Sequence, residues 1–136
     1  AEDMRDQNVP QDADSLLAVA DLALEDQGRQ CFCRVLRPGP GQPAAGLVLA
    51  NIIFSVKFAG RALWIENLYV SKSWRRRGYG RLLVSSVLDW AEDHQIKGID
   101  LEAYQGNTPA AVLYRSLGFE RLNRERFYFA FSWLDD

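Results

Sequence analysis

A glycine- and arginine-rich segment in the middle of the chain carries the residue types that bind phosphate. It reads SKSWRRRGYGR over residues 71–81, after an apolar run that predicts a strand and before a run with helical spacing. The first turn of a helix has backbone N–H groups without intrahelical partners, and the helix dipole adds partial positive charge there. Gly78 and Gly80 would let the backbone approach a phosphate closely. The amides of residues 76–81 therefore predict a pyrophosphate site.

Two other phosphate-binding motifs do not fit this segment. A P-loop requires Gly-Lys followed by Ser or Thr, whereas Gly80 is followed by Arg81 and Leu82. The dinucleotide fingerprint requires a third glycine where Leu83 stands. That fingerprint also follows the first strand of a βαβ unit, whereas this segment lies in the middle of the chain. The remaining alternative is a glycine loop with a solvated basic face, and the segment by itself does not separate this alternative from a phosphate site.

Length, composition and charge limit the class of protein. With 136 residues, 48% apolar and 25% charged, we expect one domain over residues 1–136. Charges interrupt the apolar stretches and the first ten residues are acidic, so we expect neither a membrane span nor a signal peptide. Residues 71–81 carry five cations and no acid, whereas residues 1–30 carry eight acids against two arginines. A compact cation cluster in an acidic protein favours a small polyanion over nucleic acid.

The two cysteines, Cys31 and Cys33, lie two residues apart on a predicted strand and would share one face. A metal site is the alternative to buried thiols, but His94 is the only histidine and no second pair of ligands exists. We therefore expect buried, reduced thiols, no metal, and a cytoplasmic location. His94 itself is expected at the surface and has no assigned role.

The elements that would position the glycine-rich segment follow from hydrophobic periodicity. Helices are predicted at residues 14–27, 81–95 and 107–118. The first would place Leu16, Ala20, Ala23, Leu24 and Gln27 on one side, and the second has apolar residues at helical spacing: Leu83, Val87 and Trp90 or Ala91. Strands are predicted at residues 30–36, 45–58, 61–70, 98–104 and 126–133. The second and third strands are joined by a glycine turn and should form a hairpin. A mixed sheet with helices on its faces is the simplest architecture.

Three motifs, found in this order, resemble the GNAT superfamily of N-acetyltransferases. Residues 75–80, RRRGYG, match its Q/R-x-x-G-x-G/A signature between a strand and a helix. Residues 107–119, NTPAAVLYRSLGF, are similar to its second motif. Residues 64–70, WIENLYV, resemble the L-E-D-L-Y/F-V strand of the diamine (spermidine/spermine) acetyltransferase group. The resemblance covers about residues 45–133.

The resemblance implies an α/β (α+β mixed) GNAT-type fold, in which a mixed, mostly antiparallel sheet splays at the cofactor strand and has helices on both faces. It implies that acetyl-CoA is the cosubstrate, with its pantetheine arm between residues 61–70 and 98–104. The cofactor-binding residues that it implies are Leu68, Tyr69, Val70, Arg75, Arg76, Arg77, Gly78, Tyr79, Gly80, Arg81, Asn107 and Tyr114. Asn107 would either bond the pantetheine arm or simply cap its helix.

The resemblance also implies catalytic roles for Glu66 and Tyr114. An alkyl amine resembles lysine, with a pKa of about 10.4, so it must lose a proton before it attacks a thioester. Glu66 is the candidate base, acting through a water, and a backbone amide near Val70 could stabilise the oxyanion. Tyr114 stands where the family has a tyrosine that protonates the leaving thiolate. The alternatives are a solvent-facing strand residue for Glu66 and an aromatic packed on its helix for Tyr114.

The acceptor is less defined than the cofactor. Residues 1–30 lack the family's usual first strand and contain one acceptor-side helix instead of two, and Asn67 replaces the acid usual beside Glu66. We expect direct attack by a primary amine in a ternary complex, and a small cationic amine because residues 1–30 are acidic. The alternatives are a protein N-terminus, a lysine or an antibiotic amine as acceptor, or a non-catalytic coenzyme A-binding module. A homodimer is a further expectation, with neither nucleic acid nor membrane as partner.

Overall fold

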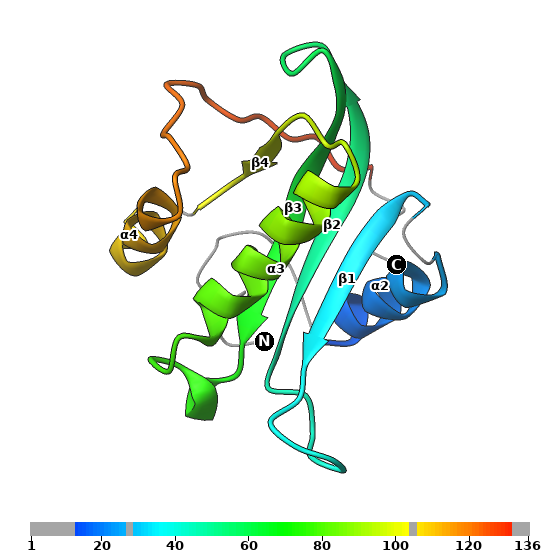
Figure 1. The fold of residues 1–136 in the computed structure, drawn as a ribbon, viewed down its shortest axis with the longest axis vertical. Helices are drawn as coiled ribbons and strands as arrows, with labels where there is room; N and C mark the ends of the chain where they lie inside the picture. The colour runs from blue at the N-terminus through cyan, green and yellow to red at the C-terminus, as the bar shows by residue number, and fades with distance from the viewer. Residues whose placement is uncertain (1–12, 27–28, 104–105, 132–136) are drawn as a thin grey trace.

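The computed structural model describes residues 13–26, 29–103 and 106–131. Within them, four strands form one sheet in the order β1-β2-β3-β4 (Figure 1). The strands are β1 Cys31–Leu36, β2 Gly46–Ser55, β3 Gly60–Val70 and β4 Ile99–Leu101. β1, β2 and β3 are antiparallel neighbours, and β4 runs parallel to β3. The predicted hairpin of β2 and β3 is therefore confirmed, as is the mixed sheet.

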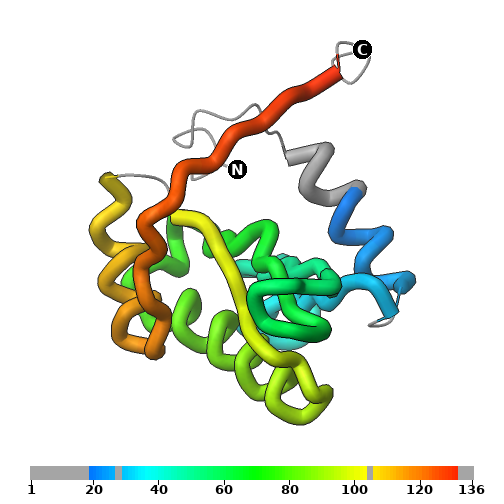
Figure 2. The backbone as a smooth tube through the Cα atoms, turned by 90° about the horizontal axis from the view of Figure 1, so that it is seen from above, coloured from blue at the N-terminus to red at the C-terminus, as the bar shows by residue number. Residues whose placement is uncertain are grey.

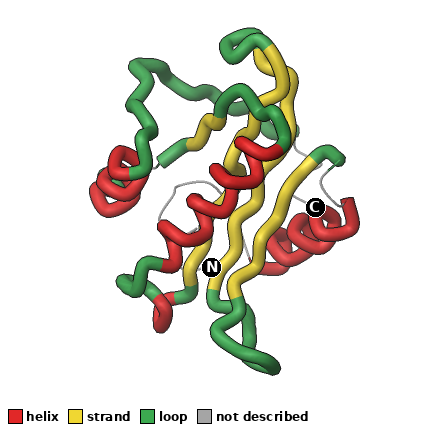
Figure 3. The backbone as a smooth tube through the Cα atoms, viewed as in Figure 1, coloured by secondary structure: helices red, strands yellow, loops and turns green. Residues whose placement is uncertain are grey.

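Helices lie on both faces of this sheet. They are α2 Ala13–Asp26, α3 Tyr79–Asp93 and α4 Thr108–Ser116, and a short 3₁₀ helix, η1 Lys72–Trp74, precedes α3. Seen from above in Figure 2, α3 lies on one side of the sheet, and α2 and the C-terminal segment lie on the other. Figure 3 shows α4 beyond the β4 edge, separated from the sheet by loops. The α/β fold class predicted from the sequence is confirmed.

The main core lies between α3 and the sheet. α3 buries Leu83, Val84, Val87 and Ala91, which recur at helical spacing as the sequence predicted. They pack against a layer of strand residues that includes Phe32, Val48, Ala50, Leu63 and Ile65. Burial of each larger aliphatic side chain contributes about 1.5–3 kcal/mol, so this layer holds α3 firmly against β3. The start of α3 is consequently fixed beside the end of β3.

α2 packs on the opposite face through small side chains. Ala20 and Ala23 are buried against Leu47 and Leu49 of β2. Leu24, which the periodicity assigned to the same face, is 50% exposed instead. The two alanines allow close approach of the helix to the sheet, and this approach turns the larger leucine outward. The prediction for Leu16 and Gln27 concerns side chains outside the described part.

The predicted strand at residues 126–133 is wrong over its described part, residues 126–131. This segment forms neither strand nor helix, and Phe127 and Phe129 are 85% and 82% exposed. An alternating apolar pattern forms a strand only where a sheet edge pairs with it. The segment instead crosses on the side of the sheet opposite α3 (Figure 2). Trp133 lies outside the described residues.

β3 contains a β-bulge at Glu66, which the sequence did not indicate. Ala50 pairs with Ile65 and Leu49 pairs with Asn67, so Glu66 has no partner in β2. An extra residue shifts the alternation of side chains between the two faces of the strand. The side chains that belong to or pack against the main core accordingly change from odd to even positions: Leu63, Ile65, Leu68 and Val70.

Candidate active site

A cleft opens where β3 and β4 separate. The parallel pairing ends at Ile65 and Leu101, although β3 continues to Val70. The cleft has a volume of about 710 Å³ and is bounded by the last residues of β3, the chain after β4, the loop before α3, and α4. The splay of the sheet that the resemblance implied is therefore present, and among the described residues the separation leaves one edge of β3 at residues 66–70 without a strand neighbour.

The loop before α3 turns sharply into the helix at the mouth of this cleft. Gly78 is the N-cap residue with a φ of 82°, a left-handed conformation that favours glycine. Arg76 adopts a φ of 63°, which costs energy in a residue with a side chain. Gly80 lies in the first turn, where an added Cβ would stand 3.5 Å from a methyl of Leu113 in α4. The first-turn amides of α3 therefore border the cleft, as a phosphate site requires.

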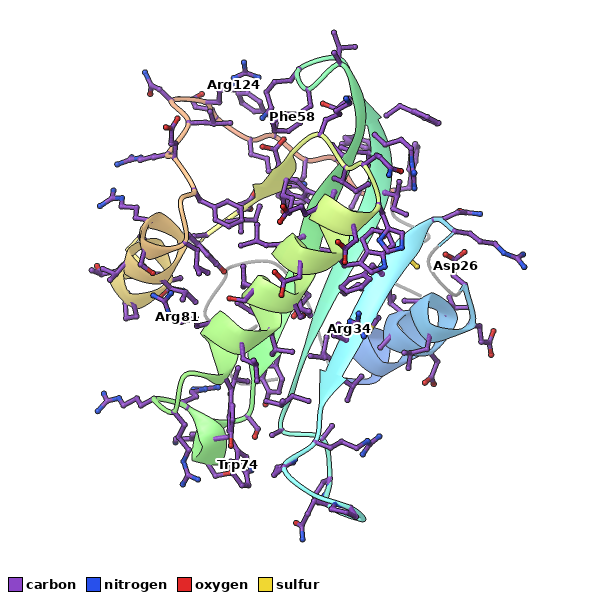
Figure 4. The ribbon with its side chains drawn as sticks, viewed as in Figure 1. Asp26, Arg34, Phe58, Trp74, Arg81 and Arg124 are labelled. Carbon is purple, nitrogen blue, oxygen red and sulfur yellow. The ribbon has the colours of Figure 1, made fainter. Side chains whose placement is uncertain are left out.

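Two arginines of this loop, and a third in the first turn of α3, contact the residues around them. Arg75 donates from Nε to the carbonyl of Val70 at 3.0 Å, which ties the loop to the end of β3. The guanidinium of Arg77 lies 4.7 Å above the ring of Trp74. Arg81 donates to the hydroxyl of Ser116 and so bridges α3 to α4; Figure 4 labels Trp74 and Arg81 at this end of the molecule.

Most of the predicted cofactor-binding residues line the cleft. Those that do are Leu68, Val70, Arg75, Arg76, Gly78, Tyr79, Gly80, Asn107 and Tyr114. Tyr69, Arg77 and Arg81 are not among its lining residues. For Tyr69 the reason is the alternation of β3, which directs it to the face opposite Leu68 and Val70. Arg77 and Arg81 make the contacts with Trp74 and Ser116 described above.

Asn107 caps α4. Its Oδ1 accepts a hydrogen bond from the backbone N–H of Ala110 at 3.3 Å, and Pro109 follows in the first turn. The capping role that the sequence left open is thus present. The residue also lines the cleft. A bond to a pantetheine arm stays a prediction.

A second, small cavity of about 50 Å³ lies where the two strands part. Its lining includes Glu66, the bulge residue, together with its neighbour Asn67. It shares Leu68, Glu102 and Tyr114 with the large cleft. The two predicted catalytic residues therefore line one cavity, and Tyr114 stands at its junction with the cleft.

The carboxylate of Glu66 is oriented by a neighbour on the same strand. The indole Nε1–H of Trp64 donates to its Oε2 at 2.9 Å. The bulge removes Glu66 from the regular ladder, and bulges commonly direct a side chain toward a site. Next to it, the side-chain oxygen of Asn67 is buried and has no hydrogen-bond partner among the described residues. Glu66 and Asn67 both line the small cavity.

Tyr114 is partly buried and packs against an aromatic ring. Its ring meets that of Phe119 edge-on, with centroids 5.9 Å apart. Burial raises the pKa of the Tyr114 phenol above its ordinary value. The hydroxyl therefore keeps its proton at neutral pH and can donate a hydrogen bond into the junction of the cavities.

Sequence reasoning missed two residues beside this site. Glu102 was assigned to the outward side of a strand, but β4 ends at Leu101 and Glu102 lines both cavities. Arg126 comes from the C-terminal segment; its Nη1 lies 2.8 Å from Oε2 of Glu102. No local pattern could have indicated this pair, because its members are far apart in the chain.

The acidic N-terminal region does not border the cavities in its described part. Asp21, Glu25 and Asp26 line neither cavity, since α2 packs over β1 and β2 rather than over the gap after β3. Figure 4 labels Asp26 on the α2 side, far from Arg81. The carboxyl of Asp26 accepts from the backbone amides of Gln30 and Cys31, and these bonds lower its pKa. Its carboxylate thus organises the turn into β1.

The two cysteines are free and share the face of β1 that packs near α2, but they are partly buried rather than fully buried as predicted. Burial raises the pKa of both Cys31 and Cys33, which keeps them in the unreactive thiol form. Within the described ranges, no three His, Cys, Asp or Glu side chains are grouped as metal ligands would be. None of the described helices combines the length and apolar character needed to cross a membrane.

The fold and the site together match one family. The profile of the Acetyltransferase (GNAT) family matches residues 2–119, and the chain belongs to this family. A solved structure, AAC(6')-Iy in complex with the bisubstrate analog CoA-S-monomethyl-acetylneamine, superposes with a TM-score of 0.71. It covers 93% of this chain and 86% of that chain at 22% sequence identity, a likeness of fold.

Curated relatives are named N-acetyltransferases. The chain is 28% identical over 107 residues to thialysine N-epsilon-acetyltransferase of Sus scrofa, covering 76% of this chain and 62% of that protein. It is 35% identical over 63 residues to the ribosomal protein bS18-alanine N-acetyltransferase of Salmonella typhimurium, covering 46% and 43%. The chain thus spans less than two thirds of the length of these relatives.

Proposed function

We propose that the protein is an acetyl-CoA-dependent N-acetyltransferase that acts on a primary amine by direct attack in a ternary complex. The observation that carries this proposal is the junction of the two cavities. The large cleft starts at the N-terminus of α3 and shares Tyr114 with a small cavity that is lined by Glu66. The arrangement supplies a place for a long polyanionic cosubstrate and a separate place for an amine.

The described residues fit acetyl-CoA as the cosubstrate. The first-turn amides of α3 and the guanidinium of Arg76 would hold the pyrophosphate. The edge of β3 at Leu68 and Val70, beyond its pairing with β4, would hydrogen-bond the pantetheine arm in strand-like fashion. The thioester would then lie at the junction, within reach of Tyr114. Acetyl-CoA supplies the activated acyl group.

The chain's own residues move the protons. Glu66, held by Trp64, would accept a proton from the ammonium form of the acceptor through a water. The neutral nitrogen bonds to the carbonyl carbon, the C–S bond breaks so that coenzyme A leaves as a thiolate, and the second proton of the nitrogen passes through water to that thiolate, which gives the amide and free coenzyme A thiol. Tyr114 would donate a hydrogen bond to the sulfur as it becomes a thiolate. Because burial raises the pKa of Tyr114, a hydrogen bond is favoured over complete proton transfer.

A small cationic amine is the acceptor that the site favours. The small cavity is lined by Glu66, whose carboxylate would attract positive charge, and by Glu102, which is paired with Arg126. The name of one relative includes thialysine, a small cationic amine. A protein N-terminus is the second candidate, favoured by the likeness to a ribosomal protein alanine N-acetyltransferase.

The experiment is an amine panel assayed by release of free thiol from acetyl-CoA. It should include a polyamine, an amino sugar, an arylamine and a peptide with a free N-terminal alanine, each at low and high salt. We expect the polyamine to have the highest kcat/KM at low salt, and its advantage to fade as the Debye length falls from about 10 Å at 0.1 M to about 3 Å at 1 M. An equal or higher kcat/KM for the amino sugar, the arylamine or the peptide at low salt would contradict the choice of a small cationic amine.

Cofactor binding is tested separately by calorimetry. Replacing Gly78 and Gly80 together by leucine should abolish binding of acetyl-CoA, since the first position has a left-handed φ and the second faces α4 across the cleft. The single variant Gly41→Leu, at another glycine with a left-handed φ but far from the cleft, is the control. Unchanged affinity in the double variant would contradict the site. A cytoplasmic location and a homodimer stay predictions, the latter to be checked by sedimentation.

A further inference from the structure

A cation from the chain itself rests beside the small cavity. The guanidinium carbon of Arg126 lies 4.1 Å from the centroid of the Trp64 ring. The same guanidinium makes the 2.8 Å ion pair with Glu102. An aromatic face and a carboxylate are the two kinds of group that bind an organic cation in proteins. The structure therefore contains an assembled cation site with a cation in it.

This cation site is continuous with the candidate catalytic residues. The indole that carries Arg126 on its face donates its Nε1–H to Glu66. The carboxylate that pairs with Arg126 lines the cavity that Glu66 and Tyr114 also line. One indole ring thus separates the cation from the carboxylate of the candidate base. A molecule with two amino groups could place one at Glu66 and the other at the position of Arg126.

Arg126 is held weakly enough to be displaced. Its side chain is 56% exposed and that of Glu102 is 52% exposed, so water screens the ion pair. Residues 120–131, which carry it, form neither helix nor strand, and nearly all their side chains are exposed. Moving this segment would break no ladder of backbone hydrogen bonds within it. A ligand cation could therefore replace the guanidinium at small cost.

We propose that the face of Trp64 and the carboxylate of Glu102 form a subsite for the second cationic group of a diamine or polyamine acceptor. In the free protein Arg126 fills this subsite, and the acceptor displaces it. The proposal rests on the proposed function, because it assigns the remote end of an amine whose other end is acetylated. It makes the distance between two charged groups, rather than overall charge, the basis of acceptor choice.

The test compares 1,4-diaminobutane with butylamine, which has the same length but one amino group, in the full chain. In Glu102→Gln, the KM for the diamine should rise about three- to tenfold, and that for butylamine should stay within about twofold. In Arg126→Gln, the KM for the diamine should fall about two- to fivefold, since the competing cation is gone. Arg124→Gln, on the same segment (Figure 4), is the matched control and should change neither value.

A binding measurement separates this proposal from the proposed function. The NMR signal of the Trp64 indole N–H, assigned by its loss in Trp64→Phe, should shift on addition of the diamine in the parent protein and much less in Glu102→Gln, whereas butylamine, whose amino group would meet Glu66, should cause the same shift in both proteins. The shift requires binding but no turnover, so it would be observed even if no amine is acetylated. Absence of acetylation would contradict the proposed function and not the subsite. If amines are acetylated but the diamine leaves the Trp64 signal in place, or both substitutions alter the two amines equally, the subsite does not exist.

Discussion

The first half of β3, residues 60–65, has strand neighbours on both sides at residues 63–65, whereas the second half, residues 66–70, has a strand neighbour on one side only among the described residues. The first half buries Ala62, Leu63 and Ile65 in the core. The second half borders both cavities with half-buried or exposed side chains. The bulge at Glu66 marks the change from one half to the other. Loss of one strand neighbour converts a structural strand into a binding edge, since the freed backbone groups need partners.

If this division is correct, substitutions in the two halves should separate activity from stability. The largest effect is expected for Glu66→Gln, which removes the basic group but keeps an oxygen that accepts from Trp64. The kcat/KM for the amine should fall by about 10² to 10⁴, the contribution of general base catalysis. Steady-state kinetics and a thermal melt measure the two quantities. Glu92→Gln, on the exposed end of α3, is the control, and full activity of Glu66→Gln would remove Glu66 as the base.

Leu63→Ala should show the opposite behaviour. Leu63 is completely buried between α3 and the sheet, so its truncation should lower the free energy of unfolding by about 2–5 kcal/mol. Leu68→Ala, in the second half, is the matched comparison and should cost less stability but weaken acetyl-CoA binding. Urea denaturation and calorimetry test the pair. Equal losses of stability would mean that the two halves do not differ as described.

Tyr114→Phe tests the side of the cleft that faces the second half of β3. The change keeps the ring and its edge-on contact with Phe119 but removes the hydrogen-bond donor. A hydrogen bond to a charged partner contributes about 1.5–3 kcal/mol, so kcat should fall about 10- to 100-fold. Affinity for acetyl-CoA should stay within a few fold. An unchanged rate of the chemical step would assign Tyr114 to packing alone.

The smallest effect is expected in the pH profile. Since burial raises the pKa of Tyr114, the phenol keeps its proton beyond its ordinary value of about 10, and kcat should not fall through loss of this proton below that pH. Tyr114→Phe should therefore have the same alkaline profile as the parent up to pH 10. A decline between pH 8 and 10 that disappears in this variant would contradict the direction of the shift.

Part of the fold and of the site could be predicted because the signals are local. The spacing of Leu83, Val87 and Ala91 fixed the buried face of α3, and Asn107 with Pro109 fixed the start of α4. Two glycines before a helix indicated the phosphate-binding turn. In each case the physical cause lies within a few residues: helical period, capping, or the backbone freedom of glycine.

The sequence by itself determined the family motifs, the order of the elements and the residues that could bind phosphate or move a proton. Only the tertiary structure decided that Glu66 is a bulge residue, that β4 pairs for three residues, and that Glu102 meets Arg126. It also decided that the alternating apolar segment near the C-terminus forms no strand in its described part. Register, edge pairing and long-range ion pairs depend on segments far apart in the chain, so no local pattern encodes them.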